Sequence, residues 1–459
     1  MRTVVYGAKE VFLGPAPADE SVESFDGQAR EPLARTTDWK PSDQGPPTVI
    51  EDGAVVVEDG TVVAVGRSDP VTREYPPGSA DTAIDASGRA VLPGFVDSHT
   101  HALFAGDRSD EFAAQLRGKS YQEILAEGGG ILRTVRAVRA ADEETLLDNL
   151  RGHLDTMLAH GTTTVEVKSG YGLDVETELR MLDVIARADE THPVDVVATF
   201  MGAHAVPEAE NGPTGTRGNG SAAGDRGNRG DRGDRGHGDD AEAYVEHVID
   251  EQLPAVADQG VAEFCDVFCE AGVFSVAQSR RVLEAGLDHG LVPKVHAEEL
   301  SHLGGAKLAA DLGAASADHL LHATADDARA LADAGVTPVL LPGTAFSLGA
   351  DYADPDLFAA AGAPVALATD FNPNCYSQSM GVAVALACAG MGMPPAGAVT
   401  AATHGGARAL DRPDRGTLHE GAVGDLLVLD APTHVHVPYN FGVNAVDVVL
   451  KRGEVVHGG

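Results

Sequence analysis

Short, continuously apolar segments alternate with amphipathic ones through the middle of the chain, residues 94–415. Segments such as EETLLDNLRGHLDTMLAHG place apolar residues at helical spacing and close on a glycine, Gly161. Between such helices, eight segments have the character of strands that are buried on both faces: GFVDSH, TTTVEV, VDVVATF, FCDVFC, LVPKVHAE, SADHL, TPVLLPG and PVALATD. Eight strand–helix repeats predict an α/β protein with a (β/α)8 TIM barrel, and a doubly wound open sheet is the alternative.

Residues with high strand propensity gather at both ends of the chain. VVYGAKEVFLG reads as a strand, and AVVVEDGTVVAVG reads as a hairpin that turns at Asp59-Gly60. GDLLVLDAP and VDVVLKRGEVV repeat this pattern near the C-terminus. We therefore expect residues 1–93 and 416–459 to build one small β-sandwich domain from both chain termini.

Two polar segments interrupt these patterns. Residues 15–48 are rich in proline and polar side chains, which predicts a mobile loop. Residues 211–240 are rich in glycine and repeat Asp-Arg-Gly, so they cannot bury apolar area and are predicted to be a disordered surface insertion after the third barrel strand. An Arg/Gly run can bind RNA, but aspartates nearly cancel the arginines here, and we favour a neutral linker.

The charge balance limits the possible partners. The chain has 33 Lys+Arg against 70 Asp+Glu, a net charge of −37. Nucleic acids and anionic membranes need a cationic face, so neither is expected as a partner. Many acids and few lysines predict a halophilic protein adapted to concentrated salt, and an acidic protein encoded by GC-rich DNA is the alternative.

Cysteine content and hydropathy indicate the cellular compartment of the protein. Four cysteines in 459 residues make no disulfide framework. The N-terminus lacks the apolar core of a signal peptide, and no apolar run is long enough for a transmembrane helix. We therefore expect a cytoplasmic protein.

The segment DSHTH places His99 and His101 at the end of the first barrel strand. Side chains two apart on a strand share a face, so both imidazoles can reach one metal ion. Active sites of TIM barrels form at these carboxyl ends. A second pair, His434 and His436, lies outside the barrel repeats and is expected to be structural.

Three further residues end other barrel strands. His296 ends the fifth, His319 the sixth and Asp370 the eighth. A lone histidine is more often a core residue than a ligand, but these three share one end of the barrel. Imidazoles and a carboxylate suit zinc or iron. The sequence predicts a metal site at the barrel mouth.

PGFVDSHTH, followed by these strand-end residues, resembles the amidohydrolase superfamily of metal-dependent barrels. Longer segments are similar to one family within it, the imidazolonepropionases: HTHALFAGDR, SYQEILAEGGGI, GTTTVEVKSGYG, TFMGAHAVP, SADHL, LLPGT, LATDFNPN and YNFGVN. The resemblance implies one Zn²⁺ or Fe³⁺ per subunit, bound by His99, His101, His296 and Asp370. It also implies hydrolysis of the cyclic amide C–N bond of 4-imidazolone-5-propanoate to N-formimidoyl-L-glutamate, the third step of histidine degradation.

The same resemblance implies which groups move protons. Glu299 and His319 line the site, and either could take a proton from water or stabilise the oxyanion. Asp370 is the candidate to carry the proton to the leaving nitrogen. Glu298 is the neighbouring alternative, but the match to HAEE assigns the functional carboxylate to Glu299. The division of roles stays open at this point.

Substrate contacts follow from the resemblance as well. Arg108 is the matching arginine for the propionate, because its planar guanidinium suits a carboxylate. Tyr171 and His204 match contacts to the ring and the carboxylate. Without the resemblance, Arg108 would read as a solvated loop residue, Tyr171 as a core tyrosine and His204 as a loop histidine.

The loop after the eighth strand departs from the family pattern. The family usually has Asp-Phe-Asn-Pro-Gly followed by Ser or Thr, whereas this chain has Asn374 and Cys375 in the last two positions. Asn372 keeps its match as a ligand contact. Asn374 can replace glycine in a left-handed turn, and Cys375 exchanges a hydroxyl for a weaker hydrogen-bonding group. Cys375 lacks the partners of a nucleophile.

Two other functions are alternatives to this one. A binuclear amidohydrolase, such as a hydantoinase or a base deaminase, needs a bridging carboxylated lysine, for which Lys168 is the candidate. A non-catalytic barrel that serves as a scaffold is disfavoured by the complete set of ligands. For assembly, a symmetric homodimer is the expected state.

Overall fold

The structure is a computed structural model that describes residues 1–15, 47–119, 123–124, 127–207 and 236–458. Its central feature is a sheet of eight parallel strands, and each of them falls on a predicted strand segment. In sheet order the strands are β6 (Phe95–Asp97), β7 (Thr162–Lys168), β8 (Asp195–Ala203), β9 (Phe264–Cys269), β10 (Val292–Ala297), β11 (Ser316–His319), β12 (Thr337–Leu340) and β13 (Ala366–Leu367). The chain has the predicted TIM-barrel class.

The barrel closes just beyond the ends of its first and last strands. Thr100 and Phe371 form a parallel bridge. The backbone N–H of Asp370 donates to the carbonyl of His99 (3.1 Å), and that of His101 donates to the carbonyl of Phe371 (2.9 Å). This seam brings two segments that are far apart in sequence together, and it carries three of the predicted metal ligands.

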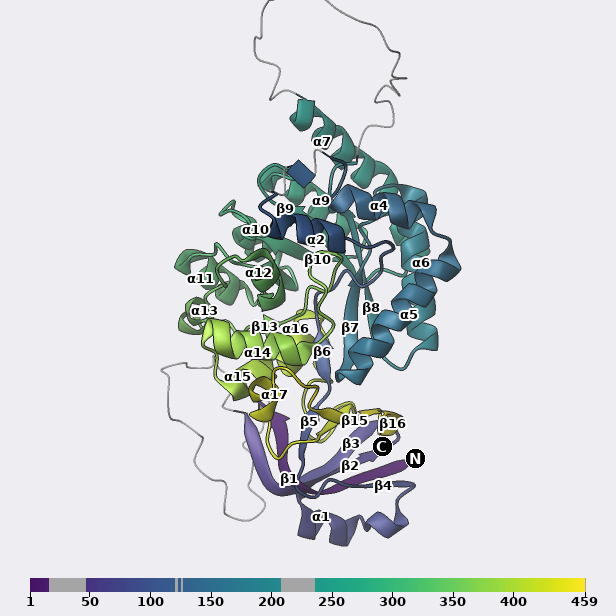
Figure 1. Cartoon of the computed structure of the whole chain (residues 1–459), viewed down its shortest axis with the longest axis vertical. Helices are drawn as coiled ribbons and strands as arrows, with labels where there is room; N and C mark the ends of the chain where they lie inside the picture. Colours follow the sequence, from purple (N-terminus) through teal and green to yellow (C-terminus); the bar gives the residue numbers. More distant parts are fainter. Residues whose placement is uncertain (16–46, 120–122, 125–126, 208–235, 459) are drawn as a thin grey trace, which may run out of the picture.

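Helices cover the outside of the barrel (Figure 1). Their sequences show why they begin where they do: the side chain of Asp142 accepts from the N–H of Thr145 at the start of α5, and Asp174 does the same for Thr177 in α6. The barrel helices are α2 (Ser109–Leu116), α4 (Ile131–Ala140), α5 (Glu143–Ala159), α6 (Val175–Thr191), α7 (Gly236–His247), α8 (Leu253–Gln259), α9 (Val276–Asp288), α10 (Gly305–Leu312), α11 (Ala325–Ala334), α12 (Pro342–Leu348), α13 (Pro355–Ala361), α14 (Met380–Met391), α15 (Pro395–Thr400) and α16 (Gly406–Ala409), with π-helical turns at Val248–Gln252 and Ala401–Gly405.

The two chain ends form a second sheet, and Figure 1 places both termini in it. Its strands are β1 (Arg2–Gly14), β2 (Thr48–Glu58), β3 (Thr61–Arg67), β4 (Thr82–Asp85), β5 (Ala90–Pro93), β14 (Leu426–Leu429), β15 (Val446–Lys451) and β16 (Glu454–His457). They hydrogen-bond as one continuous mixed sheet in the order β16-β15-β14-β5-β1-β2-β3, with β4 on the edge of β1. The antiparallel pair β5–β14 joins the N-terminal part to the C-terminal part.

The predicted hairpin is present, with Asp59 and Gly60 in the left-handed region between β2 and β3. The strand patterns did not reveal β4 and β5, because both are short and β4 alternates between partly and fully exposed residues. Three short helical segments complete this part of the chain: α1 (Ser68–Glu74), a 3-10 turn at Pro77–Ser79 and α17 (His436–Tyr439).

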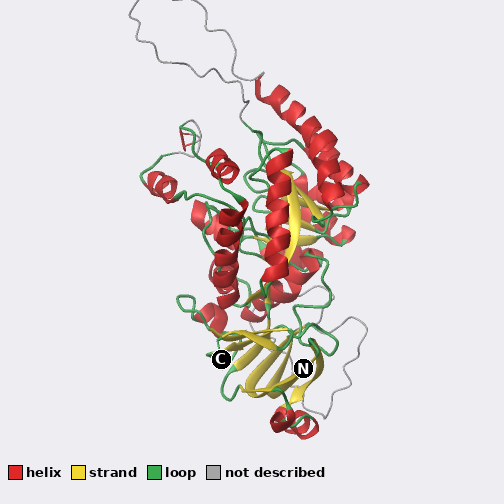
Figure 2. Ribbon diagram, turned by 90° about the vertical axis from the view of Figure 1, so that its right-hand side faces the viewer, coloured by secondary structure: helices red, strands yellow, loops and turns green. Residues whose placement is uncertain are grey.

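The small sheet packs against the amino ends of the barrel strands. Lys451 Nζ donates to the carbonyl of Thr163 near the start of β7 (2.9 Å) and contacts Asp195 at the start of β8 (2.8 Å). Figure 2 shows the sheet as a layer across one end of the barrel, with α1 on its far side. The carboxyl ends of the strands, where the predicted ligands lie, therefore face away from it.

Residues 16–46, most of the predicted mobile loop, and 208–235, most of the predicted insertion, lie outside the described residues. The expectation of disorder is wrong for residues 236–240, which form the start of α7, and Thr48 belongs to β2. Among the described helices, none combines the length and apolar character needed to cross a membrane.

Candidate metal centre and active site

Four side chains converge at the carboxyl ends of the barrel strands: His99 and His101 just after β6, His296 in β10 and Asp370 just after β13. His296 Nε2 lies 3.4 Å from His101 Nε2. Asp370 Oδ1 lies 3.6 Å from His99 Nε2 and 3.7 Å from His101 Nε2. Ligand atoms of the three histidines all lie within 4.8 Å of one another. Four donors thus surround one small space.

These donors fit a zinc or iron ion. His99 Nε2 is fully buried and has no hydrogen-bond partner among the described residues, a costly state for a polar atom that no cation satisfies. Burial lowers the pKa of His99 and His101 well below its usual value, so both imidazoles are neutral and keep a lone pair. Neutral imidazoles with one carboxylate are a common ligand set for these metals.

Asp370 is held in place by its neighbours. The hydroxyl of Thr344, in α12, donates to Oδ2. The amide of Asn372 donates to Oδ1 (3.1 Å) and to the backbone carbonyl of Asp370 (2.8 Å). Asp370 itself has φ of 50°, a conformation that non-glycine residues rarely adopt. Local contacts outweigh this strain and aim the carboxylate at the histidines.

Glu299 and His319 form a pair beside the four ligands. Glu299 Oε2 lies 3.5 Å from His319 Nε2, and the His319 ring lies 5.1 Å from the His296 ring between centroids. Burial raises the pKa of Glu299 to about 8, and the nearby carboxylate of Asp370 adds to this shift. Burial lowers the pKa of His319 well below its usual value, so its imidazole is neutral. The pair combines a carboxyl group that titrates near neutral pH with a neutral imidazole.

The neighbouring carboxylate, Glu298, has a different environment. It accepts hydrogen bonds from the backbone N–H groups of Leu303, Gly304 and Ala306, at 2.7–3.1 Å for the shorter contact of each. These groups lie at the start of α10, where unpaired N–H groups favour a carboxylate. Glu298 therefore holds the loop that carries Glu299.

Tyr171 and His204 lie next to the ligands. The His204 ring stacks on His101, with centroids 4.7 Å apart and 19° between the planes. His204 Nδ1 lies 3.0 Å from the carbonyl of Gly170, so its N–H donates there and Nε2 remains an acceptor. The ring of buried Tyr171 lies 5.2 Å from His204 and 5.9 Å from His101. Both predicted contacts thus line the ligand cluster.

Arg108 lies outside the ligand cluster, at the N-cap of α2. It is buried, and its Nε donates to Glu111 Oε2 at 2.8 Å. Glu111 also accepts from the backbone N–H of Gly130 (3.1 Å). Among the described residues, the terminal nitrogens of the Arg108 guanidinium have no hydrogen bond. The structure therefore fixes one edge of the guanidinium and does not bring Arg108 into direct contact with the metal ligands.

The loop after β13 accommodates Asn374 and Cys375, the two residues that depart from the family pattern. Asn374 is not among the residues with positive φ, so its turn does not need glycine. Its N–H and that of Cys375 donate to Asn372 Oδ1, at 2.7 and 3.0 Å. Cys375 Sγ faces the carbonyl of Thr369 at 3.7 Å, and burial raises the pKa of its thiol to about 12. The side chain of Asn372 thus binds both this loop and Asp370. The thiol of Cys375 stays protonated and is not a nucleophile.

The second His-x-His pair takes no part in this site. His434 Nδ1 and its backbone N–H both bind Glu10 Oε1 at 2.7 Å, which ties α17 to β1. His436 Nδ1 lies 2.9 Å from the hydroxyl of Thr433. The pair is structural, as its position outside the barrel indicates.

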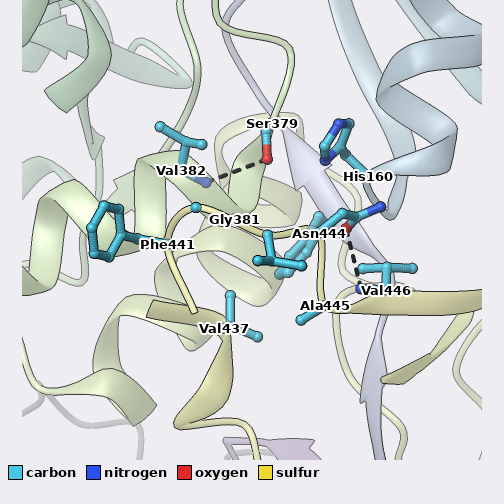
Figure 3. A pocket seen from close by; sticks show the side chains of 12 residues that line it. His160, Ser379, Gly381, Val382, Val437, Phe441, Asn444, Ala445 and Val446 are labelled. Atoms are coloured by element: carbon cyan, nitrogen blue, oxygen red, sulfur yellow. Dashed lines mark hydrogen bonds between the residues drawn. The ribbon is translucent and has the colours of Figure 1, made fainter. Parts of the chain in front are cut away.

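A cavity at the opposite end of the barrel is shown in Figure 3. It is lined by Phe95 at the start of β6, His160 after α5, Ser379 before α14, and residues 441–446. Within it, Asn444 Oδ1 accepts from the N–H of Val446 (3.1 Å). The YNFGVN segment contributes to this cavity and lies away from the metal ligands.

Comparison with known proteins agrees with the geometry. Residues 90–456 match the amidohydrolase family. The chain is 63% identical over 454 residues to a curated imidazolonepropionase of Haloarcula marismortui, covering 99% of this chain and 95% of the relative. It is 59% identical to that of Halobacterium salinarum (99% and 98% covered) and 45% identical to that of Geobacillus kaustophilus (94% and 94%). The chain belongs to the imidazolonepropionase family.

Solved structures at lower identity share the fold of this family. A triazine hydrolase variant superimposes with a TM-score of 0.70 at 17% identity, covering 100% of this chain and 95% of that one. An adenosine deaminase from Xanthomonas campestris with bound zinc gives a TM-score of 0.65 at 18% identity, covering 99% and 93%. The chain thus shares its fold with solved enzymes that carry other names.

Lys168 does not suit the bridging role that a binuclear amidohydrolase needs. Its Nζ is fully buried and lies 2.7 Å from both Glu166 Oε1 and Asp266 Oδ2. Burial alone would lower its pKa, but Asp266, Glu166 and Asp318 outweigh that effect and hold it above the usual value. A carboxylated lysine would add a negative charge beside these carboxylates. Lys168 therefore fits this imidazolonepropionase-family barrel as a positively charged ammonium group.

Sequence reasoning missed the polar residues behind the ligands. These are Thr344, which binds Asp370, and four buried charged residues of the strands: Glu166, Asp266, Lys294 and Asp318. Lys168 lies among them, and the sequence suggests it only as a bridging ligand. A signal was available, because a charge inside a short apolar strand such as FCDVFC needs a buried partner. The sequence does not reveal which partner that is.

Proposed function

We propose that this chain hydrolyses 4-imidazolone-5-propanoate to N-formimidoyl-L-glutamate, the third step of histidine degradation. The observation that carries the proposal is the cluster of His99, His101, His296 and Asp370 with the Glu299–His319 pair beside it. The chain bearing this cluster is 63% identical to a named imidazolonepropionase over nearly its whole length.

The four ligands would hold one Zn²⁺ or Fe³⁺. When bound, such an ion supplies Lewis-acid chemistry, because it polarises a carbonyl oxygen and lowers the pKa of water. The bond that breaks is the ring amide C–N bond. The oxygen of water adds to the carbonyl carbon, one water proton is removed, and the ring nitrogen gains a proton as it leaves. The new carboxylate stays on the glutamate product.

Glu299 is the base for this step. Its raised pKa makes the carboxylate a strong enough base to take the water proton near neutral pH. His319, neutral and 3.5 Å from Glu299 Oε2, donates a hydrogen bond to the oxyanion that forms on the carbonyl carbon. Glu299 hands the water proton to Asp370, whose pKa is raised to about 6 by burial, and Asp370 delivers it to the leaving nitrogen.

Four residues orient the substrate around these groups. Tyr171 and His204 enclose the ring beside His101, and Arg108 receives the propionate with its terminal nitrogens. Asn372 contacts the substrate from the loop that also carries Asp370, Asn374 and Cys375. The carboxylate of the substrate and its ring are thus recognised by separate groups.

The experiment that tests the function follows the imidazolone absorbance of freshly prepared substrate with purified protein in molar salt. We expect loss of the absorbance band, appearance of formimidoylglutamate, and loss of the rate after treatment with a chelator. Metal binding without any turnover would indicate that the substrate is another cyclic amide or amidine.

The Glu299→Gln variant is expected to lower kcat by about 10²–10⁴-fold, the usual contribution of a general base. Glutamine keeps the shape of the side chain, so metal content and KM should stay close to the wild-type values. The matched control is Glu263→Gln, an exposed carboxylate paired with Arg412, which should leave kcat unchanged. Wild-type kcat in Glu299→Gln would assign the base to another group.

We further propose a homodimer adapted to concentrated salt in the cytoplasm. The net charge of −37 opposes association at low salt and is screened at high salt. The two relatives of highest identity named above come from halophiles. The four free cysteines suit a reducing compartment. Tyr439, Phe441 and Val443 are 73–77% exposed. Phe441 and Val443 line the cavity of Figure 3, and a second copy offers the same apolar surface.

Sedimentation velocity in molar salt tests the dimer. The double variant Tyr439→Ser/Phe441→Ser is expected to weaken dimerisation by about 30-fold or more, because exposed aromatic side chains dominate such interfaces. Activity per chain should persist, since these residues lie at the far end of the barrel from the ligands. A wild-type protein that sediments as a monomer, or a variant that dimerises equally well, would contradict this interface.

A further inference from the structure

A second layer of charged side chains lies inside the barrel, behind the metal ligands. It consists of five residues, all fully buried, on four strands of the barrel: Glu166 and Lys168 in β7, Asp266 in β9, Lys294 in β10 and Asp318 in β11. The proposed mechanism uses none of them. A buried layer of this kind is costly to desolvate, so its arrangement calls for an explanation.

Two members of the layer contact the ligand histidines. Asp318 Oδ2 lies 2.6 Å from His99 Nδ1, and Asp266 Oδ1 lies 3.1 Å from His296 Nδ1. A carboxylate accepts a hydrogen bond, so each Nδ1 is the donor in its pair, which leaves Nε2 as the ring nitrogen available to a metal ion. The Nε2 atoms are those that face the other ligands, at 3.6 Å for His99 to Asp370 and 3.4 Å for His296 to His101.

Lys168 binds Asp266 directly, whereas Asp318 Oδ2 lies 3.9 Å from Lys168 Nζ and 4.0 Å from Lys294 Nζ, as a longer ion pair. Lys168 Nζ donates to Asp266 Oδ2 and to Glu166 Oε1, both at 2.7 Å. Lys294 Nζ donates to the carbonyl of Ser98 (3.1 Å) and lies 3.5 Å from Glu166 Oε1 and 4.0 Å from Asp318 Oδ2. Two ammonium groups thus face three carboxylates, which leaves the layer with a charge of −1 beneath the proposed cation.

The third ligand histidine lacks this support. His101 Nδ1 is buried and has no hydrogen-bond partner among the described residues. Its ring is instead stacked against His204. The layer therefore acts on His99 and His296 specifically, and a general packing role would not distinguish these two from His101.

We propose that Asp266 and Asp318 are positioning residues that orient His296 and His99 for metal binding, with Lys168 and Lys294 fixing the two carboxylates. This inference rests on the metal site of the proposed function. Carboxylates that bind the outer nitrogen of a ligand histidine typically contribute 10–100-fold to metal affinity. They act by fixing the tautomer and the ring orientation before the ion arrives.

The test measures the zinc dissociation constant of purified full-length protein by competition with a chromogenic chelator in molar salt. Asp266→Asn and Asp318→Asn keep the side-chain shape, and each is expected to raise the Kd by about 10–100-fold. The matched control is Asp425→Asn, an equally buried carboxylate that binds Lys451 at 2.6 Å in the small sheet. Its Kd should equal the wild-type value.

A double variant separates positioning from simple charge. Asp266→Asn/Lys168→Met removes one negative and one positive charge, so the net charge of the layer stays at −1. Positioning predicts that the weak zinc binding of Asp266→Asn persists in the double variant, whereas a purely electrostatic role predicts that wild-type affinity returns. The double variant removes both charges of this pair, and Glu166, which loses its contact with Lys168, keeps Lys294 Nζ at 3.5 Å as a partner.

The absorption spectrum of the cobalt(II)-loaded protein gives a second readout. We expect the ligand-field bands to shift in Asp266→Asn and Asp318→Asn and to stay unchanged in Asp425→Asn. An unchanged Kd together with an unchanged spectrum would overturn the inference, even if turnover fell. Zinc binding is measured without substrate, so a failure of the proposed reaction would be recognised separately, by wild-type protein that binds zinc and opens no ring.

Discussion

Replacing His296 with alanine is expected to remove the bound metal ion and to lower kcat by at least about 10³-fold. His296 supplies one of four ligand atoms, and its Nε2 lies 3.4 Å from that of His101. The remaining three donors would leave the ion weakly held. Loss of an ion that contributes several kcal/mol to the transition state corresponds to a rate effect of this size.

Metal content after dialysis, measured by elemental analysis, and turnover of the imidazolone substrate check this result together. The His289→Ala variant is the control, since His289 is an exposed residue at the C-cap of α9 and should keep both metal and activity. The circular dichroism spectrum should match that of the wild type in both variants. Full metal occupancy in His296→Ala would contradict its assignment as a ligand.

The barrel could be predicted from the sequence because its signals are local. Each of the eight strands is a short apolar run, and each ligand stands at the end of such a run, as His296 does in KVHAE. The carboxyl ends of parallel strands meet at one end of a barrel whatever the loops do. Strand order and strand ends are therefore enough to predict that His99, His101, His296 and Asp370 lie together.

The parts that escaped prediction depend on long-range pairing or on backbone strain. Asp318 binds His99 across 219 positions of sequence, and no local pattern specifies that partner. Glu298, His319 and Asp370 adopt positive φ although none is glycine, because surrounding contacts impose a conformation that the residue type disfavours. Conversely, Asn374 stands where the family usually has glycine, and it adopts no positive φ.

Arg108→Ala is expected to raise KM for the propionate substrate by about 10–100-fold. A hydrogen bond to a charged group contributes about 1.5–3 kcal/mol, and each 1.4 kcal/mol corresponds to a factor of ten. Glu111 Oε2 holds Nε at 2.8 Å, so the guanidinium is oriented before the substrate arrives. Arg108→Lys keeps the charge without the planar pair of donors, and its KM should lie between those of the other two proteins.

Steady-state kinetics with two substrates decide whether this effect arises from the propionate. With an imidazolone that lacks the carboxylate, wild type and Arg108→Ala should have nearly equal kcat/KM, because the group that Arg108 binds is missing. Arg329→Ala is the control, as Arg329 is an exposed arginine of α11 that pairs with Asp326, away from the Arg108–Glu111 network, and its KM should not change. A KM that stays at the wild-type value in Arg108→Ala would place the carboxylate on another residue. A penalty that persists with the truncated substrate would instead assign Arg108 to the shape of the α2 segment, since Glu111 and Gly130 are bound in the same network.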